Sequence, residues 1–244
     1  MRNIAKVIRA LAGCIVLSIT LSPWLAADSQ ADDRTLWASV LSAMKPAERL
    51  VAGEAQVTIE VTGSHGERLR SGSYRERTTI VGGKLATEKT DQRTSGRTKT
   101  AKSAGSDAKE AGNFRSLLGP RSVDPFGNSA TLESAPTGQR RTTGPEPAAA
   151  FRLKWADPDG NRFEGEIWVG LASRLALDGR FRRIGGPADV KNLEIAVRYQ
   201  NRNGTAVPES RSIQADVTQN LFFSAHIRMD YRFFDYFEIP KETK

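Results

Sequence analysis

The sequence has few of the residues that most enzymes and metalloproteins use for chemistry. Its 244 residues include one cysteine, Cys14, and two histidines, His65 and His226. A single cysteine excludes an internal disulfide framework and a cysteine-rich metal site. The two histidines lie far apart in the chain and lack the spacing of metal ligands. We therefore interpret His65 as a turn residue and His226 as a strand-surface residue.

Several sequence motifs that indicate a particular ligand are also missing. The chain has no glycine-rich phosphate loop and no nucleophile elbow. It is basic, with a formal net charge of +8 at pH 7, but the charge is spread along the chain. It lacks the basic helix or arginine–aromatic platform that nucleic-acid binders carry. We expect no cofactor, no metal and no nucleic-acid partner, although a basic surface can favour an anionic membrane.

Two carboxylate pairs remain as candidates for chemistry. The turn 157–160 has two aspartates flanking a proline, but it lacks the further ligands that calcium needs. Glu164 and Glu166 share one face of a predicted strand, as a glycosidase pair would, and Arg162 and Arg180 are available as cross-strand salt partners. We favour a protein that is not an enzyme and keep a glycan hydrolase as an alternative.

The first 31 residues have the pattern of a secretory signal peptide. A positively charged start precedes an apolar run, Ala10 to Leu21, which is short for a bilayer span, and then a small-x-small site that ends at Ala31. We expect cleavage after Ala31, with Ala27 as the competing site and an uncleaved anchor as the alternative. The remaining chain, 32–244, is long enough for one exported domain with a substantial core.

Cys14 ends the segment Leu11-Ala12-Gly13-Cys14, which matches in residue type the lipobox at which bacterial lipoproteins are cut and acylated. Most of the hydrophobic run follows Cys14, whereas a lipobox should close that run. We therefore favour a cleaved periplasmic protein over a lipoprotein tethered through Cys14.

One helix and a series of strands are predicted after the cleavage site. Asp33 can cap a helix that begins at Arg34, and Trp37, Val40, Leu41 and Met44 then form one apolar face. This helix packs on a sheet or, as the alternative, lies in a membrane interface. Apolar and polar residues then alternate, as in half-buried strands, over 55–61, 69–81, 151–155, 162–169, 175–182, 193–199, 207–217 and 227–233. The fold class is mainly β (α+β): a large curved antiparallel sheet or incomplete barrel with an amphipathic N-terminal helix packed on it.

Two segments interrupt the alternation. Residues 89–112 contain almost no large apolar side chain, which predicts a flexible polar insertion with a frayed strand at 88–93. Residues 119–149 are rich in proline, glycine, serine and threonine, which predicts loop. Between them, Phe114, Leu117 and Leu118 form a short apolar anchor. We expect a single domain that carries both segments as excursions from its sheet.

This order of elements resembles the periplasmic lipoprotein-carrier superfamily of the LolA/LolB type, which sorts outer-membrane lipoproteins. The likeness is carried by Gly165, Trp168 and Val169, by the strand Leu175 to Phe181, and by the closing Arg228-Met229-Asp230-Tyr231. In relatives the turn after Trp-Val contains an acidic residue, a glycine and a Leu-Pro-Leu-like step. Here Gly170, Arg174 and Leu175-Ala176-Leu177 stand at those places.

The resemblance implies an incomplete barrel whose concave apolar face is covered by helices and accepts acyl chains. The partner it implies is a lipid or the acyl chains of lipoproteins. Aromatic and aliphatic side chains on successive strands either line such a cavity or fill an ordinary core, in which case the protein is a structural or interaction module of the cell envelope. The candidates for the cavity are Val57, Ile59, Tyr74, Trp155, Ile167, Trp168, Ile195, Tyr199, Met229, Tyr231 and Phe233.

Export predicts a defined mature N-terminus. N-terminal sequencing of the protein recovered from the periplasm should begin at Asp32 or Asp28, because these residues follow the two candidate cleavage sites. An acylated Cys14 at the new N-terminus would replace the soluble assignment by a tethered lipoprotein. Recovery of Met1 in a cytosolic fraction would contradict export itself.

Overall fold

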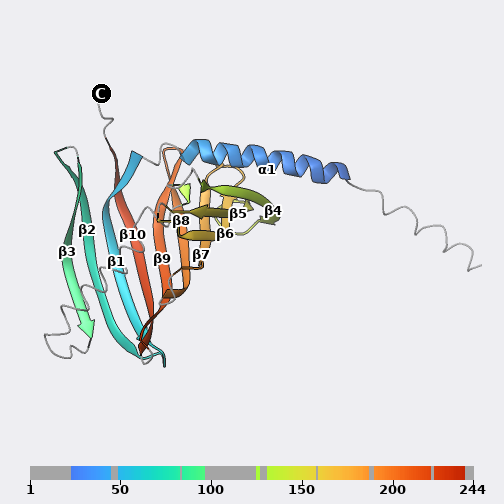
Figure 1. The fold of residues 1–244 in the computed structure, drawn as a ribbon. Coiled ribbons are helices and arrows are strands. Elements are labelled where there is room, and N and C mark those ends of the chain that lie inside the picture. Colours follow the sequence, from blue (N-terminus) through green and yellow to red (C-terminus); the bar gives the residue numbers. More distant parts are fainter. Residues whose placement is uncertain are drawn as a thin grey trace, which may run out of the picture.

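The computed structural model describes residues 23–44, 49–82, 84–96, 125–126, 131–157, 159–186, 190–220 and 223–239. Within these ranges the chain forms the helix α1 (Pro23–Met44) and ten strands. The strands are β1 (Leu50–Gly63), β2 (Arg68–Val81), β3 (Lys84–Gly96), β4 (Glu133–Arg141), β5 (Ala148–Ala156), β6 (Arg162–Gly170), β7 (Ala176–Ile184), β8 (Val190–Arg202), β9 (Thr205–Asn220) and β10 (Phe223–Glu238). The predicted fold class, an open antiparallel sheet with a helix packed on it, is confirmed (Figure 1).

The strands make one sheet in the order β3-β2-β1-β10-β9-β8-β7-β6-β5-β4. Neighbours in sequence pair antiparallel, except β3 and β4, and the last strand, β10, pairs with the first, β1, as well as with β9. In that central pair Val57 lies opposite Tyr231 and Ile59 opposite Met229. The β10–β1 pairing therefore joins the two ends of the chain in the middle of the sheet and leaves β3 and β4 as its edges.

Strand alternation gives the sheet two distinct faces. The apolar face contains the cross-strand row of Phe151, Ile167, Gly179, Val197, Arg211, Tyr231, Val57 and Tyr74. The opposite, polar face contains the neighbouring row of Arg152, Glu166, Arg180, Ala196, Ser212, Asp230 and Thr58. Side chains of one strand point alternately to the two faces, so a single register sorts the apolar from the polar positions over most of the sheet.

Helix α1 covers part of the apolar face, as its apolar stripe predicts. The Trp37 ring lies 5.0 Å from the ring of Phe151 and 6.3 Å from that of Phe126. Val40 and Met44 are buried beside it. The Asp33 carboxylate, 3% exposed as a residue, is ion-paired with Arg140 of the edge strand β4. Packing and an ion pair thus fix the helix on the sheet.

The helix begins earlier than the sequence predicts. It starts at Pro23 instead of Arg34, since proline suits the first helical turn and the alanine-rich segment after it propagates a helix readily. Asp33 therefore lies inside the helix and binds Arg140 in place of capping a helix N-terminus. No helix among the described residues is long and apolar enough to cross a membrane.

Two strands occupy segments where the sequence predicts loop. β3 is a continuous strand over 84–96, where a polar insertion with fraying was expected, and β4 lies within the predicted loop 119–149. Both are edge strands with largely exposed side chains, so they are held by main-chain hydrogen bonds and need few apolar residues. The rest of the insertion, 97–112, lies outside the described residues, as do the apolar anchor around Phe114 and the lipobox-like segment.

The turn between β6 and β7 is held by a side chain from another loop. Glu146 accepts hydrogen bonds from the backbone N–H groups of Ala172, at 3.1 Å, and Ser173, at 3.0 Å. Burial raises the pKa of Glu146, but hydrogen bonds from the side chain and backbone of Ser173 and from the Ala172 N–H outweigh it, so the pKa lies below its usual value. A Cβ at Gly170 would lie 2.3 Å from Glu146 Oε1, so any larger residue there would displace the Glu146 carboxylate. Glu146 thus supplies a carboxylate to a turn whose own residues have none.

Two phenylalanines test how the fold divides between core and surface. Phe151 is 1% exposed and packs against Trp37, whereas Phe234 is 41% exposed on the polar face. Phe151→Ala should lower the free energy of unfolding by about 3 to 5 kcal/mol, because it removes the contact between helix and sheet. Phe234→Ala, the matched control, should cost less than about 1 kcal/mol. Urea unfolding of both variants measures the difference, and equal losses would contradict the assignment of the core.

Candidate functional site: two faces of an open sheet

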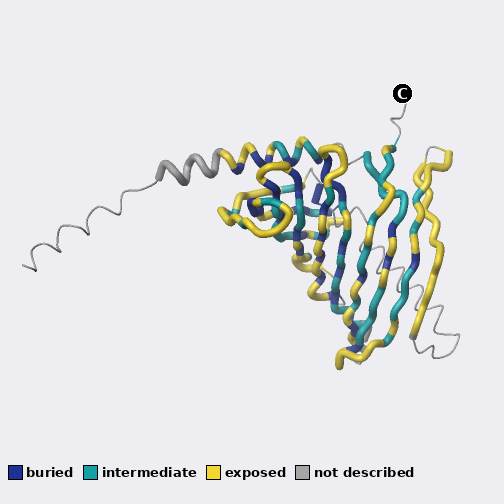
Figure 2. The backbone as a smooth tube through the Cα atoms, turned by 180° about the vertical axis from the view of Figure 1, so that it is seen from behind, coloured by how far each residue is buried: buried dark blue, intermediate teal, exposed yellow. Residues whose placement is uncertain are grey.

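Burial on the apolar face decreases from one half of the sheet to the other (Figure 2). Beneath α1, the side chains of β5 to β9 are fully buried around Phe151, Ile167 and Ile195. Toward β10, β1 and β2 the same face mixes two degrees of burial: Val57, Tyr74 and Met229 are buried, whereas Ile59, Ile227 and Tyr231 are half buried. At the far edge Ile80 and Leu85 are 37% and 40% exposed. The apolar face therefore continues past the part that the helix covers.

The half-buried part centres on Ile59, Ile227, Tyr231 and Phe233, which we call the apolar strip. Tyr231 and Phe233 stack with ring centroids 5.9 Å apart and an interplanar angle of 9°. The guanidinium of the buried Arg211 lies 5.6 Å from the Phe233 ring centre. The strip thus combines flat aromatic surface with a positive charge at its border.

The sequence-predicted cavity residues lie together, with one exception. Register places all of them on the apolar face except Trp168, which projects from the polar face, where the Arg141 guanidinium lies 4.7 Å from its ring centre. Ile59, Tyr231 and Phe233 are half buried and belong to the apolar strip. The others are buried in the core: Val57, Tyr74, Trp155, Ile167, Ile195, Tyr199 and Met229. Sequence alternation identified the face, but depth of burial depends on where α1 lies.

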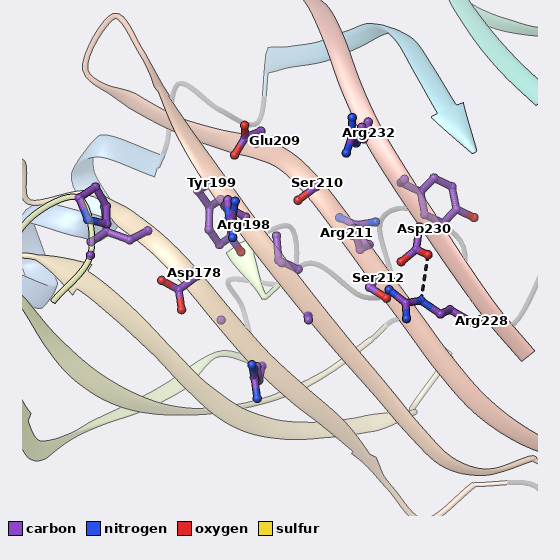
Figure 3. Close-up of a pocket in the computed structure, with 18 of the residues that line it drawn as sticks. Asp178, Arg198, Tyr199, Glu209, Ser210, Arg211, Ser212, Arg228, Asp230 and Arg232 are labelled. Atoms are coloured by element: carbon purple, nitrogen blue, oxygen red, sulfur yellow. Dashed lines mark hydrogen bonds and ion pairs between the residues drawn. The ribbon is translucent and has the colours of Figure 1, made fainter. Parts of the chain in front are cut away.

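The polar face carries a wide groove of about 1210 Å³ over β7 to β10 and β1, bordered by the loop between β4 and β5 (Figure 3). Arg198, Ser210 and Arg232 follow one another across β8, β9 and β10. Arg228 and Asp230 form an ion pair at 2.9 Å, and Asp178 is ion-paired with Arg141. We call this feature the polar groove.

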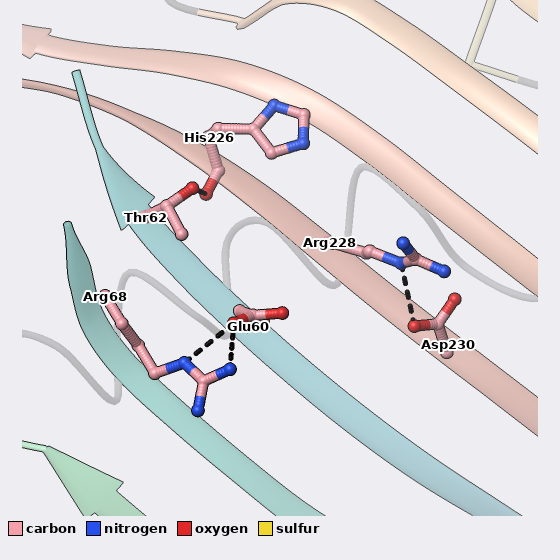
Figure 4. Close-up of polar contacts among 6 residues, drawn as sticks. All are labelled: Glu60, Thr62, Arg68, His226, Arg228 and Asp230. Carbon is pink, nitrogen blue, oxygen red and sulfur yellow. Dashed lines mark hydrogen bonds and ion pairs between the residues drawn. The ribbon is translucent and has the colours of Figure 1, made fainter. Parts of the chain in front are cut away.

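Some charges of the polar face beyond the groove form cross-strand pairs (Figure 4). Arg68 of β2 binds Glu60 of β1 at 2.7 Å, and the Thr62 hydroxyl donates to the His226 carbonyl at 3.5 Å. The His226 ring lies 3.0 Å from the Asp216 carboxylate. His226 is an exposed strand residue and His65 an exposed turn residue, so both interpretations of the histidines are confirmed.

The carboxylates that suggested chemistry have structural roles. Glu164 binds Arg182, whose Nε lies 3.0 Å away, and not the expected Arg162, because register places Arg182 directly opposite it. Glu166 lies opposite Arg180, the expected salt partner, but these two described side chains form no ion pair. The Asp157 carboxylate accepts the backbone and side-chain N–H groups of Asn161, both at 2.8 Å, and closes its turn. Among the described residues no group of three or more acidic, histidine or cysteine side chains could hold a metal ion.

Sequence reasoning did not single out the polar groove. Alternation placed Arg198 and Arg232 on polar strand faces, which is also where ordinary solvated charges lie. Their alignment across β8, β9 and β10 depends on strand order and register, which one sequence does not reveal.

These features define a class of protein: an open, curved antiparallel sheet with one face partly covered by a helix. The sequence matches no family model, and no curated protein is similar to it. The fold is similar to the crystal structure of the LolA superfamily protein NE2245 from Nitrosomonas europaea, with 9% identity over 83% of this chain and 93% of that chain and a TM-score of 0.33.

Two further solved structures are similar. One is an outer membrane lipoprotein-sorting protein domain from Vibrio parahaemolyticus, with 8% identity over 88% of this chain and 93% of that chain and a TM-score of 0.38. The other is the Pseudomonas aeruginosa MucA/MucB complex, with 11% identity over 86% of this chain and 99% of that chain and a TM-score of 0.20.

The pair of His226 and Asp216 predicts a small pH dependence of stability. Hydrogen bonds from His226 and Asn192 lower the pKa of Asp216 below its usual value. The folded state therefore gains stability from this carboxylate above its unfolded pKa, and loses it as pH falls through the lowered folded pKa. Both side chains are nearly half exposed, so solvent screening keeps the effect below about 1 kcal/mol.

Urea unfolding between about pH 5 and about pH 3 measures this contribution. Asp216→Asn should lose less stability over the range than the parent protein. Asp159→Asn, in the exposed turn between β5 and β6, is the control and should follow the parent. Parallel curves for Asp216→Asn and the parent would contradict the prediction.

Proposed function

We propose that this protein is an exported, non-enzymatic binding protein of the cell envelope that holds acyl chains of lipids or lipoproteins on its apolar strip. The observation that carries the proposal is the continuation of the apolar face beyond α1. The strand faces that are buried under the helix at β5 to β9 carry half-buried side chains between buried ones at β10 and β1.

The chemistry of the strip suits an acyl chain. Ile59 and Ile227 are aliphatic, and the stacked rings of Tyr231 and Phe233 form a flat surface beside them. Burying apolar surface contributes about 25 cal/mol per Å², so a chain lying along several such side chains gains several kcal/mol.

A second function remains a candidate because of the filled core. Seven of the predicted cavity residues are buried among other protein side chains, as they would be in a structural or interaction module without a ligand. The two candidates differ at the strip alone. In an interaction module, Ile59 and the other residues of the strip only pack against the core. Such a protein does not bind lipid at the strip.

Lipid binding should depend on the strip and not on apolar surface elsewhere. Ile59→Arg places a charge in the middle of the strip and should weaken uptake of a fluorescent fatty acid about tenfold or more, since it removes apolar contact and adds a desolvation cost. Ile184→Arg is the matched control, because Ile184 is 44% exposed on the polar face and should leave uptake unchanged. Native mass spectrometry after mild purification should show lipid on the parent protein and less lipid on Ile59→Arg.

Circular dichroism and thermal unfolding establish that both variants are folded before uptake is compared. A parent protein that is free of lipid in mass spectrometry and takes up no fatty acid would remove the carrier proposal in favour of the interaction module. Equal weakening by Ile59→Arg and Ile184→Arg would place binding away from the strip.

A further inference from the structure

The polar groove is a feature that acyl-chain binding leaves without a role. The side chains lining the groove include the small residues Ala196, Ser210 and Ser212. They also include the arginines Arg180, Arg198 and Arg232. We propose that this groove binds an extended acidic segment of a partner protein, whose carboxylates pair with Arg198, Arg232 and Arg180.

These three arginines differ from the other charges of the face. Arg141 and Arg228, which also line the groove, are each ion-paired with an aspartate. Arg180, Arg198 and Arg232 are exposed and form no ion pair or hydrogen bond with the described part of the chain. Three guanidinium groups in one concave surface repel one another, so an anionic ligand lowers their energy.

The spacing of the arginines fits an extended peptide. Arg198 on β8 and Arg232 on β10 lie in one cross-strand row with Ser210 of β9 between them. Strands are about 4.8 Å apart, so the two backbones are separated by about 10 Å. Carboxylates two residues apart in an extended chain share one face and are separated by about 7 Å, a distance that the long arginine side chains can match. Arginine binds each carboxylate through two parallel hydrogen bonds.

A buried hydroxyl on the groove floor supports a ligand that can hydrogen-bond. The Ser212 Oγ is buried and has no hydrogen-bond partner. A buried polar atom without a partner costs free energy, and a peptide carbonyl or amide in the groove supplies the missing bond. Ser212 lies opposite Asp230 and next to the row of arginines, so the same ligand reaches both.

The acidic residues of the groove favour a peptide over a uniformly charged polymer. Glu209 is exposed at the groove, and Asp178 and Asp230 are interspersed among the arginines. A nucleic acid, a polyphosphate or an anionic membrane would place negative charge against these carboxylates. A peptide with separated acidic residues avoids them and presents neutral backbone there. The groove is also concave, whereas a membrane surface is flat on this scale.

Fluorescence anisotropy tests the proposal with a fluorescein-labelled peptide of about twelve extended residues, having glutamate at every second position among serine and glycine. A peptide with glutamine at those positions is its control. The glutamate peptide should bind the full chain, and binding should weaken as salt rises from low to physiological concentration. Arg198→Gln combined with Arg232→Gln should weaken binding about tenfold or more.

The matched control combines Arg152→Gln with Arg162→Gln, which removes the same charge from exposed positions of the polar face outside the groove. It should change binding by less than about threefold, since only long-range attraction is lost. Ser212→Ala should weaken binding about threefold or more without lowering the unfolding temperature, because the hydroxyl lacks a partner in the free protein.

Three results would overturn the proposal. Equal affinity for the glutamate and glutamine peptides would show that carboxylates are not recognised. Equal weakening by the groove and control double variants would reduce the effect to net charge. Tighter binding of phosphatidylglycerol vesicles or of inorganic polyphosphate than of the glutamate peptide, lost in the groove double variant, would assign the arginines to a membrane or a uniform polyanion. None of these readouts depends on lipid uptake, so the apolar strip and the polar groove are tested separately.

Discussion

An open sheet with one apolar face must have that face covered, and the contact between α1 and the sheet meets most of this requirement. Trp37 inserts between Phe126 and Phe151, Val40 is fully buried, and Asp33 binds Arg140 on the edge strand. Without these contacts the apolar side chains of β5 to β9 would face water. Because hydrophobic burial is the largest favourable term in folding, the position of the helix decides which part of the sheet becomes core.

The extent of that cover also decides where a ligand can bind. The helix packs toward β4 to β9, and the strands beyond it carry the same apolar pattern with less burial. The β10–β1 pairing extends the face into the apolar strip by placing Tyr231 opposite Val57 and Phe233 opposite Ala55. The carrier proposal therefore depends on one long-range strand pairing and on a helix that covers only part of the sheet.

The two faces use different physical means and can act independently. The apolar strip attracts by removing hydrocarbon from water, an effect that salt hardly weakens. The polar groove attracts through exposed guanidinium groups, whose range is about 8 to 10 Å at physiological salt. In the two proposals, a single sheet offers an acyl-chain surface and an acidic-peptide surface on opposite sides, with the strand backbones between them. A bound chain on one face does not block the other.

Local periodicity in the sequence determined the strands of the central sheet, the apolar stripe of α1 and the face on which nearly all the cavity candidates lie. These features could be predicted because alternation and helical spacing are properties of neighbouring residues. The edge strands β3 and β4 could not be predicted, since exposed edge strands need no apolar pattern. The first turns of α1 were missed because they lie in a segment that also has the pattern of a signal peptide. Only the tertiary structure decided that Tyr199 is buried while Tyr231 is half exposed, that Glu164 binds Arg182, and that Arg198 and Arg232 share a row. Each of these depends on strand order, register or helix position, which bring together residues that are distant in the chain.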